Sequence, residues 1–280
     1  MSELDTPILV RPASAGVRIE AVLGALARRA GAIASLLVLL VAWEAASRSG
    51  VVTTFLLPPL SAVLARVGED AMSGELAINL GMTLYRALAG FAIAGAAGVA
   101  LGILMTRRPW VRWFFDPIVS VAFPMPKIAF LPIFMLWFGL YDTSKIAMVA
   151  FSSVFAIIAA TTAGTRGVDR YTVWSARALG ASEQGLLWEI ILPAALPQIL
   201  TGLQIALPVA LITTIVTEML MGGYGLGGAM MTASRFADSR GVFAGIVEIA
   251  VVGYVMVKIM AVLRRRLLLW HQEALAPSTV

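Results

Sequence analysis

The chain has 280 residues, of which 60% are hydrophobic and 13% charged, and its formal net charge is +5. Soluble domains carry about 25% charged residues, so this composition excludes an ordinary soluble domain and indicates a protein that is solvated largely by lipid. With no cysteine and a single histidine, His271, the sequence offers neither a Cys- or His-based metal site nor a Ser/His/Asp triad. Basic residues fall between the apolar runs, so nucleic-acid binding is not expected.

Apolar runs long enough to cross a membrane recur along the sequence. A helix needs about 20 apolar residues to cross about 30 Å of hydrocarbon. Six runs meet this length, at 30–47, 84–105, 117–139, 145–164, 199–221 and 244–263. We therefore predict an all-α polytopic membrane protein with a tail at 1–29, a six-helix domain at 30–270 and a second tail at 271–280.

Arginines indicate the orientation of these spans. The first run follows Arg28 and Arg29 but is longer than the apolar part of a signal peptide, which favours an uncleaved anchor. Lys and Arg are more frequent in the tails and in the segments after the second, fourth and sixth runs than in the other segments. Because positive residues accumulate on the cytoplasmic side, both termini are predicted to be cytoplasmic.

The first outer segment and the second run carry packing signals. Residues 52–80 contain Pro58 and Pro59, followed by a pattern that predicts an amphipathic helix at the outer surface. The second run contains four glycines, of which the last two form a G-x-x-x-G motif: Gly90, Gly95, Gly98 and Gly102. Such glycines let helix backbones approach closely, so we expect them to pack against another helix.

Lys127 lies within the third run, which is broken by Pro124, Pro126 and Pro132. A lysine at the bilayer centre costs about 2.5–3.5 kcal/mol on insertion scales, so its side chain should face protein or water. Two interpretations stay open. Lys127 either attracts an anion in a translocation path or is a structural cation that pairs with a freed carbonyl or with a carboxylate. Glu218 is the favoured partner, with Glu44 and Glu248 as others.

The segment 165–198 is long enough to form a cytoplasmic element of its own, here termed the coupling loop. Its pattern predicts a helix over 171–179, a turn at Gly180, a second helix capped by Ser182, and a return to the membrane interrupted by Pro193 and Pro197. It carries large apolar residues, namely Trp174, Leu186, Leu187 and Trp188. An exposed apolar patch of this kind indicates a protein contact, although a hairpin that merely connects two spans is the alternative.

The coupling loop resembles the "EAA" loop of permease subunits in binding-protein-dependent ABC importers. Ala176 and Gly180 match the second alanine and the glycine of that motif, and Ile190, Leu192 and Pro193 match its closing triplet. Trp174 replaces the family's glutamate and Ser175 its first alanine. Similar stretches at 57–67, 124–139 and 192–207 resemble the branch that imports nitrate, sulfonates and taurine.

This resemblance implies the type I importer fold, with a helix that docks on an ATPase subunit. The residues implied for this docking are Trp174, Ala176, Arg177, Ala178, Leu179, Gly180, Ala181 and Ser182. It further implies a location in the bacterial cytoplasmic (inner) membrane, a dimer of ATPase subunits that bind ATP and Mg²⁺, an extracytoplasmic substrate-binding protein, and two permease copies around one pore. No cofactor is expected on this chain.

The fifth run ends in a polar stripe followed by a glycine-rich segment. Its pathway candidates are Thr213, Thr214, Thr217 and Glu218, for which hydrogen bonding between helices is the commoner alternative. The run 222–228 reads GGYGLGG and predicts a tight turn or a bent re-entrant segment. It is not a phosphate loop, because no lysine in the chain follows a glycine.

The sequence therefore predicts an ABC importer permease that carries a small anion or organic acid and does not hydrolyse ATP itself. An ion-gradient-driven secondary transporter, with Lys127, Glu218 and Glu248 as coupling residues, is the main alternative. A non-transporting membrane scaffold that recruits a partner through the coupling loop is a third.

Overall fold

The computed structural model describes residue 31 and residues 34–270, and the chain divides into two units, Met1–Ala62 and Val63–Val280. In the first unit, residues 34–48 form a helix. The indole of Trp43 donates to the carbonyl of Pro58 at 3.0 Å, which fastens this helix to the segment that follows. The predicted span 30–47 begins outside the described residues, and its described part is shorter than a membrane crossing requires.

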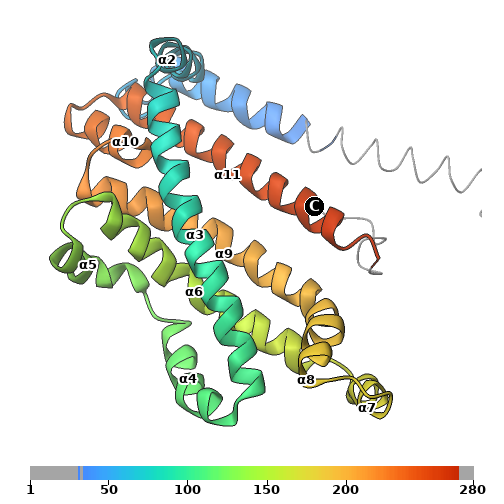
Figure 1. Cartoon of the computed structure of the whole chain (residues 1–280). Helices are drawn as coiled ribbons and strands as arrows, with labels where there is room; N and C mark the ends of the chain where they lie inside the picture. Colours follow the sequence, from blue (N-terminus) through green and yellow to red (C-terminus); the bar gives the residue numbers. More distant parts are fainter. Residues whose placement is uncertain (1–30, 32–33, 271–280) are drawn as a thin grey trace, which may run out of the picture. The chain divides into compact units, whose positions relative to one another are not determined.

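Helix α2 (Leu60–Ser73) leads from the first unit into the second. The rest of the second unit, as far as the structure describes it, is built from further helices (Figure 1). These are α3 (Glu75–Arg107), α4 (Pro109–Ala122), a 3-10 turn (Lys127–Phe130), α5 (Leu131–Phe138), α6 (Asp142–Arg166), α7 (Arg170–Ala178), α8 (Glu183–Gly185), a π-helical turn (Leu186–Ile191), α9 (Leu192–Met221), α10 (Leu226–Arg235) and α11 (Ser239–Leu267).

Four helices in the described part of the chain are long and apolar enough to cross a membrane. They are α3, α6, the continuous helix Glu183–Met221, and α11. A bent pair of shorter helices brings the number to five if the pair is counted as one span. The prediction of a polytopic all-α protein is confirmed for the described residues, while the first predicted span, 30–47, begins outside them.

The third predicted span, 117–139, is not one straight helix. The chain bends by 102° between Pro109–Ala122 and Lys127–Phe138. The break falls at Pro124 and Pro126, as their missing N–H groups predict, whereas Pro132 stands in the first turn of α5, where no N–H is needed.

Helix α6 lies between α3 and α9 and forms the centre of the second unit. The predicted packing role of the α3 glycines is confirmed at three of the four positions. A Cβ atom added at Gly90, Gly98 or Gly102 would lie 2.6–2.8 Å from side-chain atoms of α6. The two backbones therefore touch along a stripe of α3, which only glycine allows.

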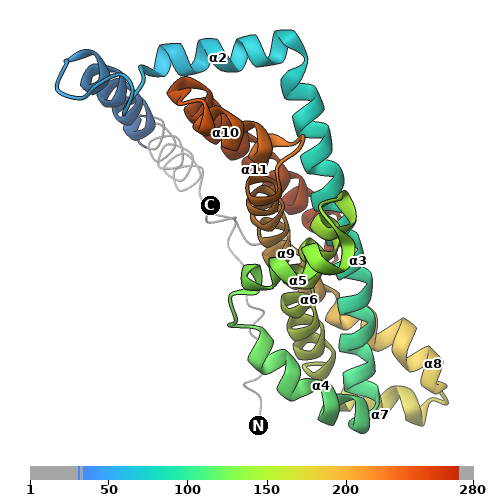
Figure 2. The ribbon, with the colours of Figure 1, turned by 90° about the vertical axis from the view of Figure 1, so that its left-hand side faces the viewer.

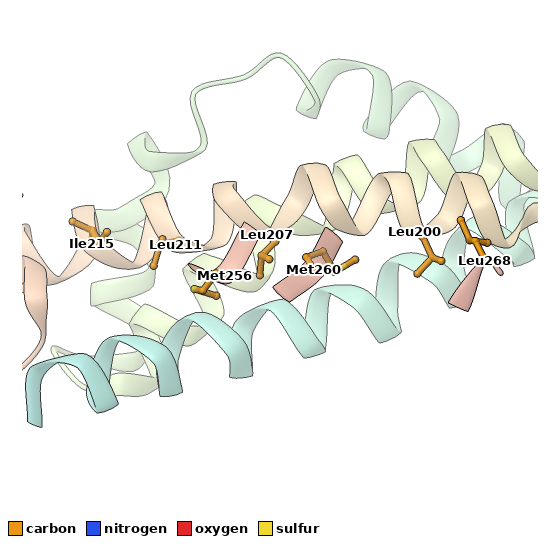
Figure 3. Close-up of a cluster of buried hydrophobic side chains, with 7 residues drawn as sticks. All are labelled: Leu200, Leu207, Leu211, Ile215, Met256, Met260 and Leu268. Carbon is orange, nitrogen blue, oxygen red and sulfur yellow. The ribbon is translucent and has the colours of Figure 1, made fainter. Parts of the chain in front are cut away.

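Helix α9, which packs against α6, also packs against α11 through apolar side chains (Figure 3). One face of α9 presents three leucines and an isoleucine toward two methionines of α11. Together with a leucine just after α11 they form a buried cluster: Leu200, Leu207, Leu211, Ile215, Met256, Met260 and Leu268. This cluster holds the last span to the central three helices.

Two features lie at opposite ends of α3, α6 and α9. Figures 1 and 2 place α7 and α8 at one end and α10 at the other. The coupling loop and the glycine-rich segment 222–228 therefore lie at opposite ends of α9, and the length of that helix separates them.

Candidate functional site

The coupling loop forms as the sequence predicts. Asp169 caps α7 by accepting from the backbone N–H of Tyr171 at 3.2 Å. Gly180 has φ +87°, a left-handed conformation that favours glycine. Ser182 caps the next helix by accepting from the backbone N–H of Gly185 at 3.0 Å. The result is a helix–turn–helix with defined caps.

Several large apolar side chains of the loop are exposed. The exposed fractions are 73% for Tyr171, 58% for Trp174 and 88% for Leu179. Trp188 is also exposed, whereas Leu186 and Leu187 are buried, so two of the four apolar residues expected on the patch pack inward instead. The patch therefore centres on α7 and the turn after it.

Ionic and hydrogen-bond contacts fasten the loop to itself and to α3. Arg177 pairs with Glu183 at 3.0 Å across the turn, and the Arg107 guanidinium donates to the carbonyl of Glu183 at 3.3 Å. The loop thus holds its two helices together without using the apolar surface of α7.

The predicted interruption at Pro193 and Pro197 is wrong, because the helix continues through both. The chain forms a π-helical turn over Leu186–Ile191, directly before Pro193. A π turn is wider than an α turn, so it accommodates a proline ring and a carbonyl without a donor. The coupling loop is consequently joined to α9 by one continuous helix.

At the other end of α9, a carboxylate and a guanidinium form a buried ion pair. Glu218 is 0% exposed and Arg86, from α3, is 3% exposed. Their atoms Oε1 and Nη1 lie 2.6 Å apart, and the Thr83 hydroxyl donates to Glu218 Oε2 at 2.9 Å. A buried pair of this kind is stable only when its remaining polar atoms are also satisfied.

The segment after α9 supplies the remaining partners of this pair. Gly222, Gly223 and Gly225, together with Tyr224, form a turn, here termed the glycine turn (222–225), in which each glycine has positive φ. Just after it, the backbone N–H of Gly227 donates to Glu218 Oε2 at 3.1 Å. The predicted tight turn at 222–228 is confirmed, and it folds back over the carboxylate.

Residues of α6 join the same site. Arg86 Nε donates to Asp142 Oδ1 at 2.7 Å, while the Lys145 ammonium donates to the carbonyl of Gly222 at 2.7 Å. Lys145 is 2% exposed. Two cations and two carboxylates therefore meet where α3, α6, α9 and the glycine turn come together. Arg86, Lys145 and Glu218 are buried, whereas the side chain of Asp142 is 42% exposed.

Lys127 does not form an ion pair with the carboxylates that were predicted as its partners. Glu218 binds Arg86, and Glu44, in the first unit, binds Arg48 at 2.6 Å. The Lys127 ammonium instead donates to the carbonyl of Phe123 at 2.7 Å, and it lies over the ring of Phe123. It satisfies a carbonyl that the end of α4 leaves without a helical donor.

Three threonines of α9, namely Thr213, Thr214 and Thr217, are buried within this chain. Thr214 donates to the carbonyl of Ala210 and Thr217 to that of Thr214, both in their own helix. Thr213 is 7% exposed. The hydrogen bonding between helices that was expected for this stripe is not found for Thr214 or Thr217, because short hydroxyls reach the preceding helical turn more easily.

Sequence analysis missed Arg86 and Lys145. The signal for Arg86 was present, since a lone arginine within an apolar run carries the same insertion cost as Lys127 and needs a partner. Glu218 is a lone carboxylate in another run, so pairing the two would have neutralised both.

These features define a class of protein, an all-α membrane transport subunit. It has an exposed loop for docking at one end, and at the other end a glycine turn that covers a buried ion pair. Residues 98–269 match the family described as "binding-protein-dependent transport system inner membrane component". The taurine transport system permease protein TauC of Escherichia coli is 35% identical, over 86% of this chain and 90% of that protein. The putative aliphatic sulfonates transport permease protein SsuC of Bacillus subtilis is 34% identical, over 84% and 86%.

The chain belongs to this family and is an inner-membrane permease component of an ABC importer. Solved structures agree on the fold. One of the MetNI methionine ABC transporter has a TM-score of 0.60 at 16% identity, covering 71% of this chain and 98% of that chain. One of an amino acid ABC transporter has a TM-score of 0.58 at 20% identity, covering 71% and 97%.

Proposed function

We propose that this permease forms the translocation path for a small sulfonate or a related organic anion of the taurine type. The relatives named for taurine and aliphatic sulfonates support this substrate class. A formylaminopyrimidine permease, ThiX of Halalkalibacterium halodurans, is 31% identical over 85% of this chain, so the chemistry of the substrate varies among relatives.

The energy comes from a separate ATPase subunit in this proposal. The chain has no G-x-x-x-x-G-K-[ST] phosphate loop, so ATP and Mg²⁺ are bound by the partner. Two copies of the permease would surround one path, with two ATPase subunits on the cytoplasmic side and a substrate-binding protein outside. The distribution of arginines supports an orientation with both termini and the coupling loop in the cytoplasm.

The observation that carries the proposal is the set of exposed apolar side chains on α7, next to a continuous helix that joins the coupling loop to α9. A patch formed by Tyr171, Trp174 and Leu179 would be costly in water and fits a groove on a partner protein. Trp174 stands where the family has glutamate, so docking here would depend on shape and apolar contact. Closure of the ATPase dimer would move α7, and the continuous helix would carry this movement into the membrane.

For the path itself we propose Lys127 as the residue that attracts the anion. Its ammonium lies at the break between α4 and α5, is partly exposed, and donates a hydrogen bond to the neutral carbonyl of Phe123. Thr213, Thr214, Thr217 and Glu218 are buried, so we assign them to the support of the helices that border the path.

Replacing Gly180 by valine tests the coupling. The left-handed φ of Gly180 disfavours a β-branched residue, although nothing lies within 4 Å of the added Cβ, so the turn should shift without disturbing the membrane helices. We expect ATP-driven uptake in proteoliposomes to fall by about tenfold or more while the permease still inserts and elutes normally. ATP hydrolysis should no longer respond to the loaded binding protein.

The matched control is Gly68→Val in α2, which places the same side chain at a helical glycine that also has nothing within 4 Å. Uptake by this control should equal that of the native permease. Uptake driven by a proton or sodium gradient without any ATPase subunit would instead support a secondary transporter.

A further inference from the structure

The glycine turn is seated directly on the buried ion pair. A Cβ atom added at Gly225 would lie 2.3 Å from the carboxylate of Glu218, so no other residue fits between turn and carboxylate. The Arg86 guanidinium donates to the carbonyl of Tyr224 at 2.5 Å, and the backbone N–H of Leu226 donates to the Thr83 hydroxyl at 2.9 Å. The same polar groups therefore neutralise one another and fix the position of the turn.

The turn also has an open side. A cavity of about 500 Å³ is lined by Gly223 and Tyr224 of the turn, by Asn79 of α3 and by residues of α10 and α11. Glu218 and Thr83, which the turn and the start of α10 contact, are fully buried. The glycine turn thus separates a space large enough for a small molecule from the closed interior of the helices.

Further polar contacts hold the two ends of the turn. Tyr224 is 69% exposed, so its side chain does not anchor the turn in a core. The Gly222 carbonyl accepts from Lys145, and Gly225 N–H donates to Asn79 Oδ1 at 2.9 Å. Loss of the ion pair would leave the turn held by isolated hydrogen bonds at its two ends.

We propose that Arg86 is a positioning residue for transport: with Glu218 it holds the glycine turn closed, and the turn and the start of α10 form the outer gate of the permease. This inference rests on the proposed function. The gate stands at the end of the helix that begins at the coupling loop, so movement of that loop acts on Glu218 and its contact with Arg86.

Cysteine labelling tests the gate, because the native chain has no cysteine. Leu226, which is 1% exposed directly behind the turn, is replaced by cysteine in the full permease–ATPase complex in proteoliposomes. A membrane-impermeant maleimide is added, and the labelling rate is measured with and without Arg86→Gln/Glu218→Gln. This double variant removes both charges of the buried pair, so neither Arg86 nor Glu218 is left as an unpaired buried charge, and Asp142, which loses its contact with Arg86, has a side chain that is 42% exposed.

We expect the double variant to raise the labelling rate of the Leu226→Cys site by about tenfold, which corresponds to an opening equilibrium shifted by about 1.4 kcal/mol. Arg86→Lys, which keeps a cation beside Glu218, should leave the Leu226→Cys site almost as well protected from labelling as it is in the native background. Lys145→Met, which removes the contact to Gly222, should also raise the labelling rate of the Leu226→Cys site. This variant is used for the test if the double variant does not fold.

Two controls separate opening of the gate from general unfolding. Phe236 is 81% exposed, so a cysteine introduced by Phe236→Cys should be labelled at the same rate in every background. Arg112→Gln/Asp116→Asn removes an exposed pair on α4 and should leave the Leu226→Cys site protected.

The outcomes distinguish the inference from the function on which it rests. Unchanged protection in both the double variant and Lys145→Met, together with normal ATP-driven uptake by the native complex, would overturn the gate and leave the transport function intact. Absence of ATP-driven uptake by the native complex would overturn the function, whatever the labelling rates are.

Discussion

Replacing Arg86 by alanine should largely prevent accumulation of folded permease. The substitution leaves the Glu218 carboxylate, which is 0% exposed, without its cation. Uncompensated burial of a charge by removal of one partner costs about 3–5 kcal/mol, a large part of the stability of a typical protein. The yield of monodisperse protein in detergent and its thermal denaturation would both measure the loss.

Arg112→Ala is the matched control, because Arg112 pairs with Asp116 at 3.7 Å and both side chains are about half exposed. Its yield and melting temperature should equal those of the native chain. If Arg86→Ala is as stable as this control, Glu218 does not depend on Arg86. If Arg86→Gln/Glu218→Gln recovers the yield, the defect lies in the unpaired charge and not in lost packing.

Replacing Gly102 by leucine should separate α3 from α6. The Cβ atom alone would lie 2.6 Å from Thr161 Cβ, and the residue is buried where the two backbones meet. Overpacking costs about 1–3 kcal/mol where side chains can move, and a backbone contact cannot relax in this way, so we expect the upper end of this range or more. Thermal denaturation of the purified permease measures it.

Gly81→Leu provides the comparison within the same helix, since nothing lies within 4 Å of a Cβ atom there. This substitution should be neutral or slightly stabilising, because leucine forms helix better than glycine. Equal melting temperatures for the two leucine variants would show that the close approach of α3 and α6 does not contribute to stability.

Local signals in the sequence were sufficient for the elements of the coupling loop. Asp169, Gly180 and Ser182 act through residues at most three positions away, so their types and spacing predict the two caps and the turn. The glycines of α3 likewise predict a close helix contact. Their partner, α6, could not be predicted, because the spacing of one helix does not identify the helix that packs on it.

The partners of the buried charges depend on the register between distant helices. Arg86 meets Glu218 because α3 begins at Glu75, earlier than its apolar run at 84–105 suggests, and lies beside the end of α9. Lys127 was the more conspicuous cation, since it stands among prolines. The same prolines end α4 and offer it a carbonyl at close range, so it needs no carboxylate.

Several other prolines of the sequence do not mark the end of a helix. Pro117, Pro197 and Pro208 all lie inside helices of the structure. In a membrane the alternative to a helix is an unsatisfied backbone, so a helix tolerates a proline that would end it in water.

The helix Glu183–Met221 contains 39 residues. At 1.5 Å per residue its contour length is about 58 Å, against about 30 Å for the hydrocarbon core of a bilayer. The helix is therefore longer than the hydrocarbon core of a membrane is thick. Tilting such a helix by one degree about one end displaces the other by about 1 Å. A rotation of a few degrees at the end of this helix that carries the coupling loop would thus displace Glu218 by more than the length of a hydrogen bond.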